Sequence, residues 1–173
     1  IRRLGSHAGK RIYFGYDRYI APILATYHDA LSAFGDVVEA VDELELHYLS
    51  SAELVCTAVR ADPESFGVLC CGTGMGMSIA ANKFRDIYAA RCITVEDAEN
   101  ARTINNSNVL CLAAKTDLAI NRQIMSAFAN TEYTGRKLDE LERITQFETT
   151  ETQPLRAVPA SRYVVLDVVR RTA

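Results

Sequence analysis

The sequence predicts a single α/β domain with three α/β/α layers around a five-stranded parallel sheet, followed by a C-terminal helical extension. Apolar runs typical of buried strands alternate with helix-forming segments five times along the chain, which favours right-handed crossovers and a parallel sheet. The runs are apolar throughout, as expected where helices cover both faces of a sheet. This architecture is Rossmann-like. A chain of 173 residues is long enough for one such core and short for two.

The predicted elements follow one another from the start of the chain. Strands are expected at 11–16, 37–41, 67–70, 88–93 and 108–113, where short runs are β-prone or apolar. Helices are expected at 20–34, 51–61, 78–84, 96–103, 118–129 and 137–147, where apolar spacing or composition is helical. We therefore expect residues 1–10 to be a flexible N-terminal arm and 11–150 the α/β domain. Residues 151–173 should form an extension that docks on this subunit or a neighbour.

Composition and charge argue against several classes of function. The chain has 19 Lys and Arg against 22 Asp and Glu, a net charge of −3, so it lacks the basic surplus of a nucleic-acid-binding protein. No apolar run reaches the ~20 residues needed to span a bilayer, and no membrane partner is expected. Its five cysteines form no CxxC pair, which suggests reduced thiols in the cytoplasm. Because His and Cys are scattered, we expect no metal site. No cofactor is expected either.

A glycine-rich loop between a buried strand and a helix is the strongest local signal. Gly72, Gly74 and Gly76 alternate there, accompanied by Thr73 and Ser78. Glycine permits positive φ and lets a ligand approach the backbone closely. Successive N–H groups in such a turn before a helix can hold a phosphate or an oxyanion. The alternative is a tight turn that binds nothing.

Two nucleotide-binding patterns do not fit this loop. No Gly-Lys-Ser/Thr sequence is present for a Walker loop. The dinucleotide pattern GxGxxG would need a third glycine at Met77. An oxyanion or phosphate site therefore explains the glycines better than a nucleotide site.

Cys71 is the predicted reactive group. Cys70 should face the core as the last strand residue, which leaves Cys71 on the loop. A thiol among the N-terminal amides of a helix has its thiolate stabilised, and a thiolate can act as nucleophile or general base. No His lies nearby in sequence, so proton transfer is favoured over acyl transfer. A buried structural cysteine is the alternative.

Further candidates should lie at the same edge of the sheet, because ligands in such folds bind beyond the carboxyl ends of the strands. Asp17 and Arg18 follow the first predicted strand, and His47 follows the second. His47 is either a site residue or a solvated loop histidine. Tyr48 could stack on a sugar or pack in the core.

Residues 71–83 closely resemble the loop and helix of the ribose-5-phosphate isomerase B / galactose-6-phosphate isomerase family. The agreement continues through Gly-Tyr-Asp at 15–17, Asn-Asn-Ser-Asn-Val at 105–109 and, weakly, 133–137, so that the resemblance covers roughly 11–148. It implies a metal-free interconversion of phosphorylated aldoses and ketoses. It also implies a homodimer or homotetramer whose sites are completed across a subunit interface.

The resemblance implies roles for individual residues. Cys71 would move a proton between C1 and C2 of the sugar through a cis-enediolate. The amides of residues 72–76, with Thr73, would hold the developing negative charge. Asp17 would bind sugar hydroxyls or assist the proton shuttle. Asn105 and Arg136 would contribute to substrate binding.

Three positions depart from the family pattern near the sugar. Arg18 stands where the family usually has His, and its guanidinium could still bind phosphate. Ile104 occupies the position of the ring-opening His and cannot transfer a proton. Lys115 stands where Arg is frequent.

The C-terminal phosphate clamp departs as well. Glu140 replaces one of its two expected Arg residues, leaving Arg136 with Lys137 or Arg143. The missing ring-opening His, Lys115 and the extended C-terminus are together similar to the Cys-bearing B-type subunit of galactose-6-phosphate isomerase, which relies on a paralogous subunit for its His.

Several alternatives stay open. Ring opening could come from a His-bearing partner chain or from His47, or be unnecessary for an acyclic tetrose phosphate. The chain could be a non-catalytic sugar-phosphate-binding homologue, favoured by Ile104 and Glu140, or an epimerase that uses the same enediolate.

Overall fold

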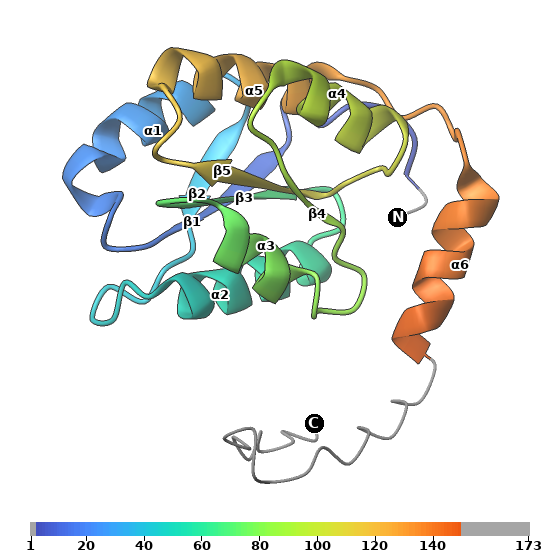
Figure 1. Ribbon diagram of the computed structural model, residues 1–173, viewed down its shortest axis with the longest axis horizontal. Coiled ribbons are helices and arrows are strands. Elements are labelled where there is room, and N and C mark those ends of the chain that lie inside the picture. The colour runs from blue at the N-terminus through green and yellow to red at the C-terminus, as the bar shows by residue number, and fades with distance from the viewer. Residues whose placement is uncertain (1–2, 150–173) are drawn as a thin grey trace, which may run out of the picture.

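The computed structural model describes residues 3–149 and contains one five-stranded, fully parallel sheet with strand order β2-β1-β3-β5-β4 (Figure 1). The strands are β1 (Arg11–Tyr16), β2 (Asp36–Glu39), β3 (Phe66–Cys71), β4 (Ala89–Arg91) and β5 (Val109–Ala113). Every residue of the neighbouring strands β3 and β5 is buried. The predicted parallel sheet is therefore confirmed, with the glycine loop following its central strand.

Helices cover both faces of the sheet (Figure 1). One face carries α1 (Leu24–Ser32), α4 (Val95–Thr103) and α5 (Leu118–Asn130), and the other carries α2 (Tyr48–Ala61) and α3 (Met75–Ala81). Two hydrophobic clusters fill the two interfaces. Cys70 packs in the first and Cys71 in the second, because successive side chains of a strand point to opposite faces. The three-layer α/β/α prediction is confirmed.

Helix starts differ from the prediction where local capping decides them. Helix α2 begins at Tyr48 because Nδ1 of His47 accepts a hydrogen bond from the Leu49 N–H over 3.3 Å. Helix α3 runs over Met75–Ala81 instead of 78–84, since Gly74 turns the chain with φ +71°. The predicted helix at 20–34 splits into a 3₁₀ turn, η1 (Ala21–Ile23), and α1.

The described part of the N-terminal segment, residues 3–10, is packed where a flexible arm was expected. The N–H of His7 donates to the carbonyl of Ala129 over 2.9 Å, and Gly5 forms an antiparallel bridge with Tyr133. The His7 ring is 6% exposed and stacks on Phe66 at a centroid distance of 4.7 Å. The two backbone contacts span more than a hundred residues and the ring contact spans 59, so local composition gives no sign of them. The predicted extension at 151–173 lies outside the described residues.

Helix α6 (Leu138–Thr149) stands beside the three layers (Figure 1). It is held by the buried Leu141 and by a 2.6 Å hydrogen bond between the hydroxyls of Tyr88 and Thr145. The carboxylate of Glu148 also accepts the N–H of Asp86. Across residues 3–149, no helix combines the length and apolar content that a membrane span requires.

Candidate active site

A cavity of about 380 Å³ lies at the carboxyl ends of β1, β3 and β5. Its lining residues come from the strand ends and the loops that follow them: Asp17, Tyr19, Tyr48, Cys71, Gly72, Thr73, Gly76 and Lys115. Parallel strands bring their carboxyl ends to one edge, which is why segments far apart in sequence meet here. Six of the twelve predicted site residues line this cavity.

Cys71 is the last residue of β3, not a loop residue as predicted. Its side chain is 6% exposed and reaches the cavity, and its Sγ accepts a hydrogen bond from the Gly74 N–H over 3.2 Å. This contact fixes the position of the sulfur relative to the glycine loop. The thiol is therefore held in one place, beside open space.

The three glycines serve different purposes. Gly74 has φ +71°, and a Cβ there would lie 3.0 Å from the carbonyl oxygen of Leu112. A Cβ on Gly76 would come within 2.9 Å of the Tyr48 ring. A Cβ on Gly72 would meet nothing within 4 Å. Gly74 is thus required by the backbone and Gly76 by the Tyr48 ring, whereas Gly72 keeps space in the cavity free.

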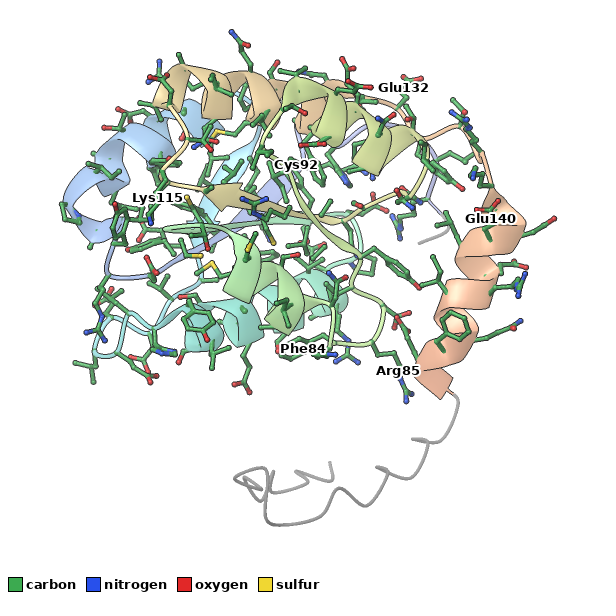
Figure 2. All side chains as sticks on the ribbon, viewed as in Figure 1. Phe84, Arg85, Cys92, Lys115, Glu132 and Glu140 are labelled. Atoms are coloured by element: carbon green, nitrogen blue, oxygen red, sulfur yellow. The ribbon has the colours of Figure 1, made fainter. Side chains whose placement is uncertain are left out.

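Neighbouring strands hold the loop in place. The N–H of Lys115 donates to the carbonyl of Gly72 over 3.2 Å, and Nε of Arg91 donates to the carbonyl of Thr73 over 2.7 Å. The exposed Lys115 side chain brings an ammonium group to the cavity, near the end of β5 (Figure 2). Sequence reasoning missed Arg91 and assigned Lys115 no role, although Arg91 ends β4 and Lys115 follows β5 at this edge.

The loop after β1 contributes a carboxylate and a phenol. Oδ1 of Asp17 accepts the N–H of Tyr19 over 2.9 Å, which fixes the turn, and both side chains line the cavity. Arg18 lies between them with an exposed side chain and is not part of the lining. Its N–H donates to the carbonyl of Leu46. Tyr19 is 54% exposed, and sequence reasoning missed it.

His47 and Ser78 are placed beside the cavity and do not line it. His47 caps α2 through Nδ1, and its ring lies 4.7 Å from that of Tyr48, which does line the cavity. Ser78 is inside α3, where its carbonyl accepts from Asn82. Gly74 acts on the site through its bond to Cys71 and is likewise absent from the lining.

The structure does not bring Asn105 and Arg136 to the cavity. Asn105 lies between α4 and β5 and is exposed. Arg136 is exposed as well, and its carbonyl accepts the Tyr133 hydroxyl over 2.9 Å. Ile104, where the family resemblance implies a ring-opening His, is the C-cap of α4 beside Asn105. All three belong to the segments that lead into or away from the amino-terminal edge of the sheet, opposite the cavity.

The titratable side chains that line the cavity are suited to proton transfer to and from an organic substrate. They are one carboxylate, one thiol, one ammonium and two phenols, from Asp17, Cys71, Lys115, Tyr19 and Tyr48. Residues 3–149 contain no group of three or more His, Cys, Asp or Glu side chains that could hold a metal ion. The arrangement combines a base, hydrogen-bond donors for an oxyanion and a cation for an anionic substituent.

Comparison with known proteins assigns this chain to a protein family. The family model described as Ribose/Galactose Isomerase matches residues 13–146, and the chain belongs to this family of sugar-phosphate isomerases. It is 36% identical over 104 residues to ribose-5-phosphate isomerase B of Escherichia coli, covering 59% of this chain and 68% of that protein. D-erythrulose-4-phosphate isomerase of Pectobacterium atrosepticum is 34% identical over 108 residues, 60% of this chain and 70% of that one.

Other relatives agree in fold or share a shorter segment. The structure matches type B ribose 5-phosphate isomerase of Leishmania infantum with a TM-score of 0.75 and 32% identity, covering 83% of this chain and 99% of that one. The Trypanosoma brucei enzyme gives a TM-score of 0.76 and 31% identity, with coverage of 81% and 99%. The DNA damage-repair/toleration protein DRT102 of Arabidopsis thaliana is 43% identical over 89 residues, which is 50% of this chain but only 29% of that protein.

Proposed function

We propose that this protein is an aldose–ketose isomerase of a phosphorylated sugar and that Cys71 is its general base. The observation that carries the proposal is the Sγ of Cys71 at the cavity wall, with the Gly74 N–H donating to it over 3.2 Å. The cavity volume of about 380 Å³ lies in the range of small-molecule sites. Family membership supplies the substrate class.

The proposed reaction moves protons without any net redox change. The Cys71 thiolate removes the C2 proton of the open-chain aldose, which leaves a cis-enediolate, and the thiol returns that proton to C1 to give the ketose. Asp17 carries the second proton from O2 to O1. The N–H groups of Gly72 and Thr73 stabilise the enediolate oxygens, an effect typically worth about 10²–10³ in rate.

We propose that Lys115 binds the phosphate. Its exposed side chain brings an ammonium group to the cavity wall, and it is the one cationic residue among those lining the cavity. Arg18 starts in the adjacent loop and is long enough to assist once substrate is bound. The ring of Tyr48 lies against Gly76 and can stack on the sugar carbons.

We further propose that Asn105 and Arg136 act in the cavity of a neighbouring subunit, in a homodimer or homotetramer or in an assembly with a paralogous chain. Both are exposed and away from their own Cys71, and the family resemblance implies sites completed across an interface. The five cysteines are all free and buried. Free thiols suit a reducing compartment, which supports a cytoplasmic location.

Ring opening limits the choice of sugar. Ile104 cannot donate a proton, so we propose either an acyclic four-carbon sugar phosphate or a larger sugar whose ring is opened by a partner chain's His. A relative named D-erythrulose-4-phosphate isomerase favours the first. A second candidate function, binding of a sugar phosphate without turnover, is favoured by Ile104 and Glu140.

Deuterium incorporation tests the proposal. The purified protein is incubated in D₂O with erythrose 4-phosphate, ribose 5-phosphate, allose 6-phosphate or galactose 6-phosphate and followed by NMR. We expect label at C1 or C2 of one sugar, with no label in Cys71→Ala. Binding of a sugar without label would favour the binding-only function. Label that persists in Cys71→Ala would overturn the role of Cys71.

A further inference from the structure

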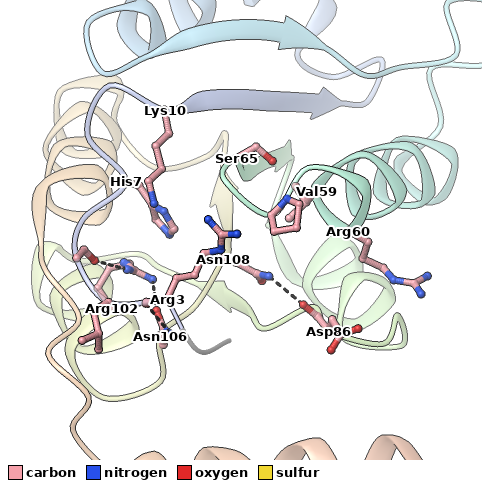
Figure 3. A pocket seen from close by; sticks show the side chains of 13 residues that line it. Arg3, His7, Lys10, Val59, Arg60, Ser65, Asp86, Arg102, Asn106 and Asn108 are labelled. Atoms are coloured by element: carbon pink, nitrogen blue, oxygen red, sulfur yellow. Dashed lines mark hydrogen bonds between the residues drawn. The ribbon is translucent and has the colours of Figure 1, made fainter.

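A second cavity, of about 210 Å³, lies at the opposite edge of the sheet (Figure 3). Three of its lining residues directly precede strands: Lys10 precedes β1, Ser65 precedes β3 and Asn108 precedes β5. The Cys71 cavity lies at the other end of the same strands. Because β3 has six residues, the two cavities are about 20 Å apart. The family chemistry proposed above makes no use of this second cavity.

Cationic side chains outnumber carboxylates in this cavity. Arg3, Lys10, Arg60 and Arg102 line it, against a single Asp86. Outside the lining, Glu64 forms an ion pair with Arg3 and lies 4.0 Å from Nζ of Lys10. Even with Glu64 included, the positive charges are in excess by two. A cavity with such an excess attracts anions.

Arg102 is the buried member of this set. It is 1% exposed, and its guanidinium donates to the carbonyls of Ser107 over 2.6 Å and Gly5 over 3.0 Å, and to Oδ1 of Asn106 over 3.0 Å. All of these acceptors are neutral, and its Nε has no hydrogen-bond partner. A buried charge without a counterion is costly, so an anion arriving here would be stabilised.

Burial and, second to it, the positive charges act on the titratable groups beside Arg102. Burial first, and then the Arg102 charge, lower the pKa of His7 to about 3. Burial, Arg102 and Arg3 also lower the pKa of Lys10. Nδ1 of His7 is buried without a hydrogen-bond partner. The cluster therefore holds like charges together, and because Nε2–H of the neutral His7 ring donates to the Ser107 carbonyl, its Nδ1 is an acceptor and the unused donor is Nε of Arg102.

We propose that this cavity binds a small phosphate-bearing dianion, held by Arg3, Lys10 and Arg102. In Figure 3, Lys10 and Arg102 lie on one side of the cavity and Arg3 reaches into the space between them and Asp86, whereas Arg60 extends away. A volume of about 210 Å³ admits a phosphate group with a few carbon atoms. Guanidinium groups match phosphate oxygens in geometry and charge.

The test is an NMR titration of the full chain, with backbone amide signals as the readout. Inorganic phosphate and glycerol 2-phosphate are the two probes, and acetate is the monovalent control. We expect saturable shifts at Gly5, Ser65 and Asn108 with both phosphates and none with acetate. Tighter binding of inorganic phosphate would identify the free ion as the ligand, and tighter binding of the ester a phosphorylated metabolite. The readout needs no turnover, so the result is independent of the proposed isomerase activity.

Substitutions at the partly exposed cations locate the site without touching the buried Arg102. Arg3→Gln and Lys10→Gln should each weaken phosphate binding by about tenfold, as expected for one charge-assisted contact. Arg122→Gln, an exposed position that lines neither cavity, should leave the affinity unchanged. Shifts confined to Gly72 and Gly76, shifts that do not saturate, or equal affinities in all variants would overturn the proposal.

Discussion

The amide N–H of Gly74 donates a hydrogen bond to the Sγ of Cys71 over 3.2 Å, within a turn of four residues. The bond exists because Gly74 adopts φ +71°, which points its N–H back at the end of β3. The same turn starts α3 and exposes Gly72 to the cavity. One backbone conformation thus orients both the thiol and the loop that faces the substrate.

Removal of the thiol should abolish proton transfer but not binding. Cys71→Ala is expected to lower kcat by about 10²–10⁴, the usual contribution of a general base. Cys71→Ser should leave the dissociation constant of the sugar phosphate nearly unchanged, because the hydroxyl occupies the same place. Cys70→Ala is the matched control, since Cys70 belongs to the opposite hydrophobic cluster. Steady-state kinetics measures kcat, and calorimetry measures the dissociation constant. A Cys71→Ala variant with normal kcat would contradict the role of Cys71 as general base.

Of two glycine substitutions in the loop, one should lower stability and the other should weaken substrate binding. Gly74→Ala places a side chain at φ +71° and 3.0 Å from a carbonyl oxygen, so we expect a loss of at least about 1–2 kcal/mol in the free energy of unfolding. Gly72→Ala has open space around its Cβ and should change stability by less than about 0.5 kcal/mol. Its methyl group enters the cavity and should raise the KM for the sugar. Urea unfolding measures the stability of the two variants, and steady-state kinetics measures their KM. Equal destabilisation by Gly72→Ala and Gly74→Ala would refute the different roles given to these glycines.

Arg91 is expected to act on the reaction by positioning the loop. Its Nε donates to the Thr73 carbonyl over 2.7 Å, and a lysine cannot reproduce this geometry. Arg91→Lys should lower kcat about tenfold, which corresponds to about 1.4 kcal/mol. The effect on stability should stay below about 1 kcal/mol, since one hydrogen bond is lost. Arg122→Lys serves as the control, and an unchanged kcat in Arg91→Lys would show that the bond is dispensable.

His7 should make stability depend on pH in the acid range. Burial lowers its pKa in the folded protein to about 3, from 6.5 in the unfolded chain. Between these values the unfolded state binds more protons, so the free energy of unfolding falls as the pH drops below 6.5 and is fully restored above it. The variant His7→Phe keeps an aromatic ring to stack on Phe66. In this variant, the slope of the free energy of unfolding against pH should decrease by up to about 1.4 kcal/mol per pH unit.

Urea unfolding of wild type and His7→Phe between pH 4 and pH 8 checks this prediction. Above pH 7 the two stability curves should run parallel, displaced by the loss of the bond from His7 to the Ser107 carbonyl, a 3.2 Å contact. Identical slopes below pH 6 would show that His7 remains protonated in the folded state.

The structure departs from the sequence-based expectations mainly at element ends and in long-range contacts. The start of α2 depends on Nδ1 of His47 accepting an N–H, and histidine is not a common N-cap residue. The predicted strand at 67–70 is one residue too short at each end, since β3 spans Phe66–Cys71. In the structure, pairing of Cys71 with Ala113 extends the strand. Such pairing depends on a partner strand about forty residues away.

The sequence by itself determined the layered parallel fold and the grouping of Asp17 with the glycine loop. Both follow from local periodicity and from the rule that parallel strands end at one edge. Tertiary structure alone decided that Lys115 and Tyr19 line the cavity, that Arg91 braces Thr73, and that Asn105 and Arg136 lie away from it. It also decided that the N-terminal segment packs across α5 and completes a cationic cavity with Arg102. Side-chain direction and contacts between distant segments arise only when the layers pack, and no local pattern encodes them.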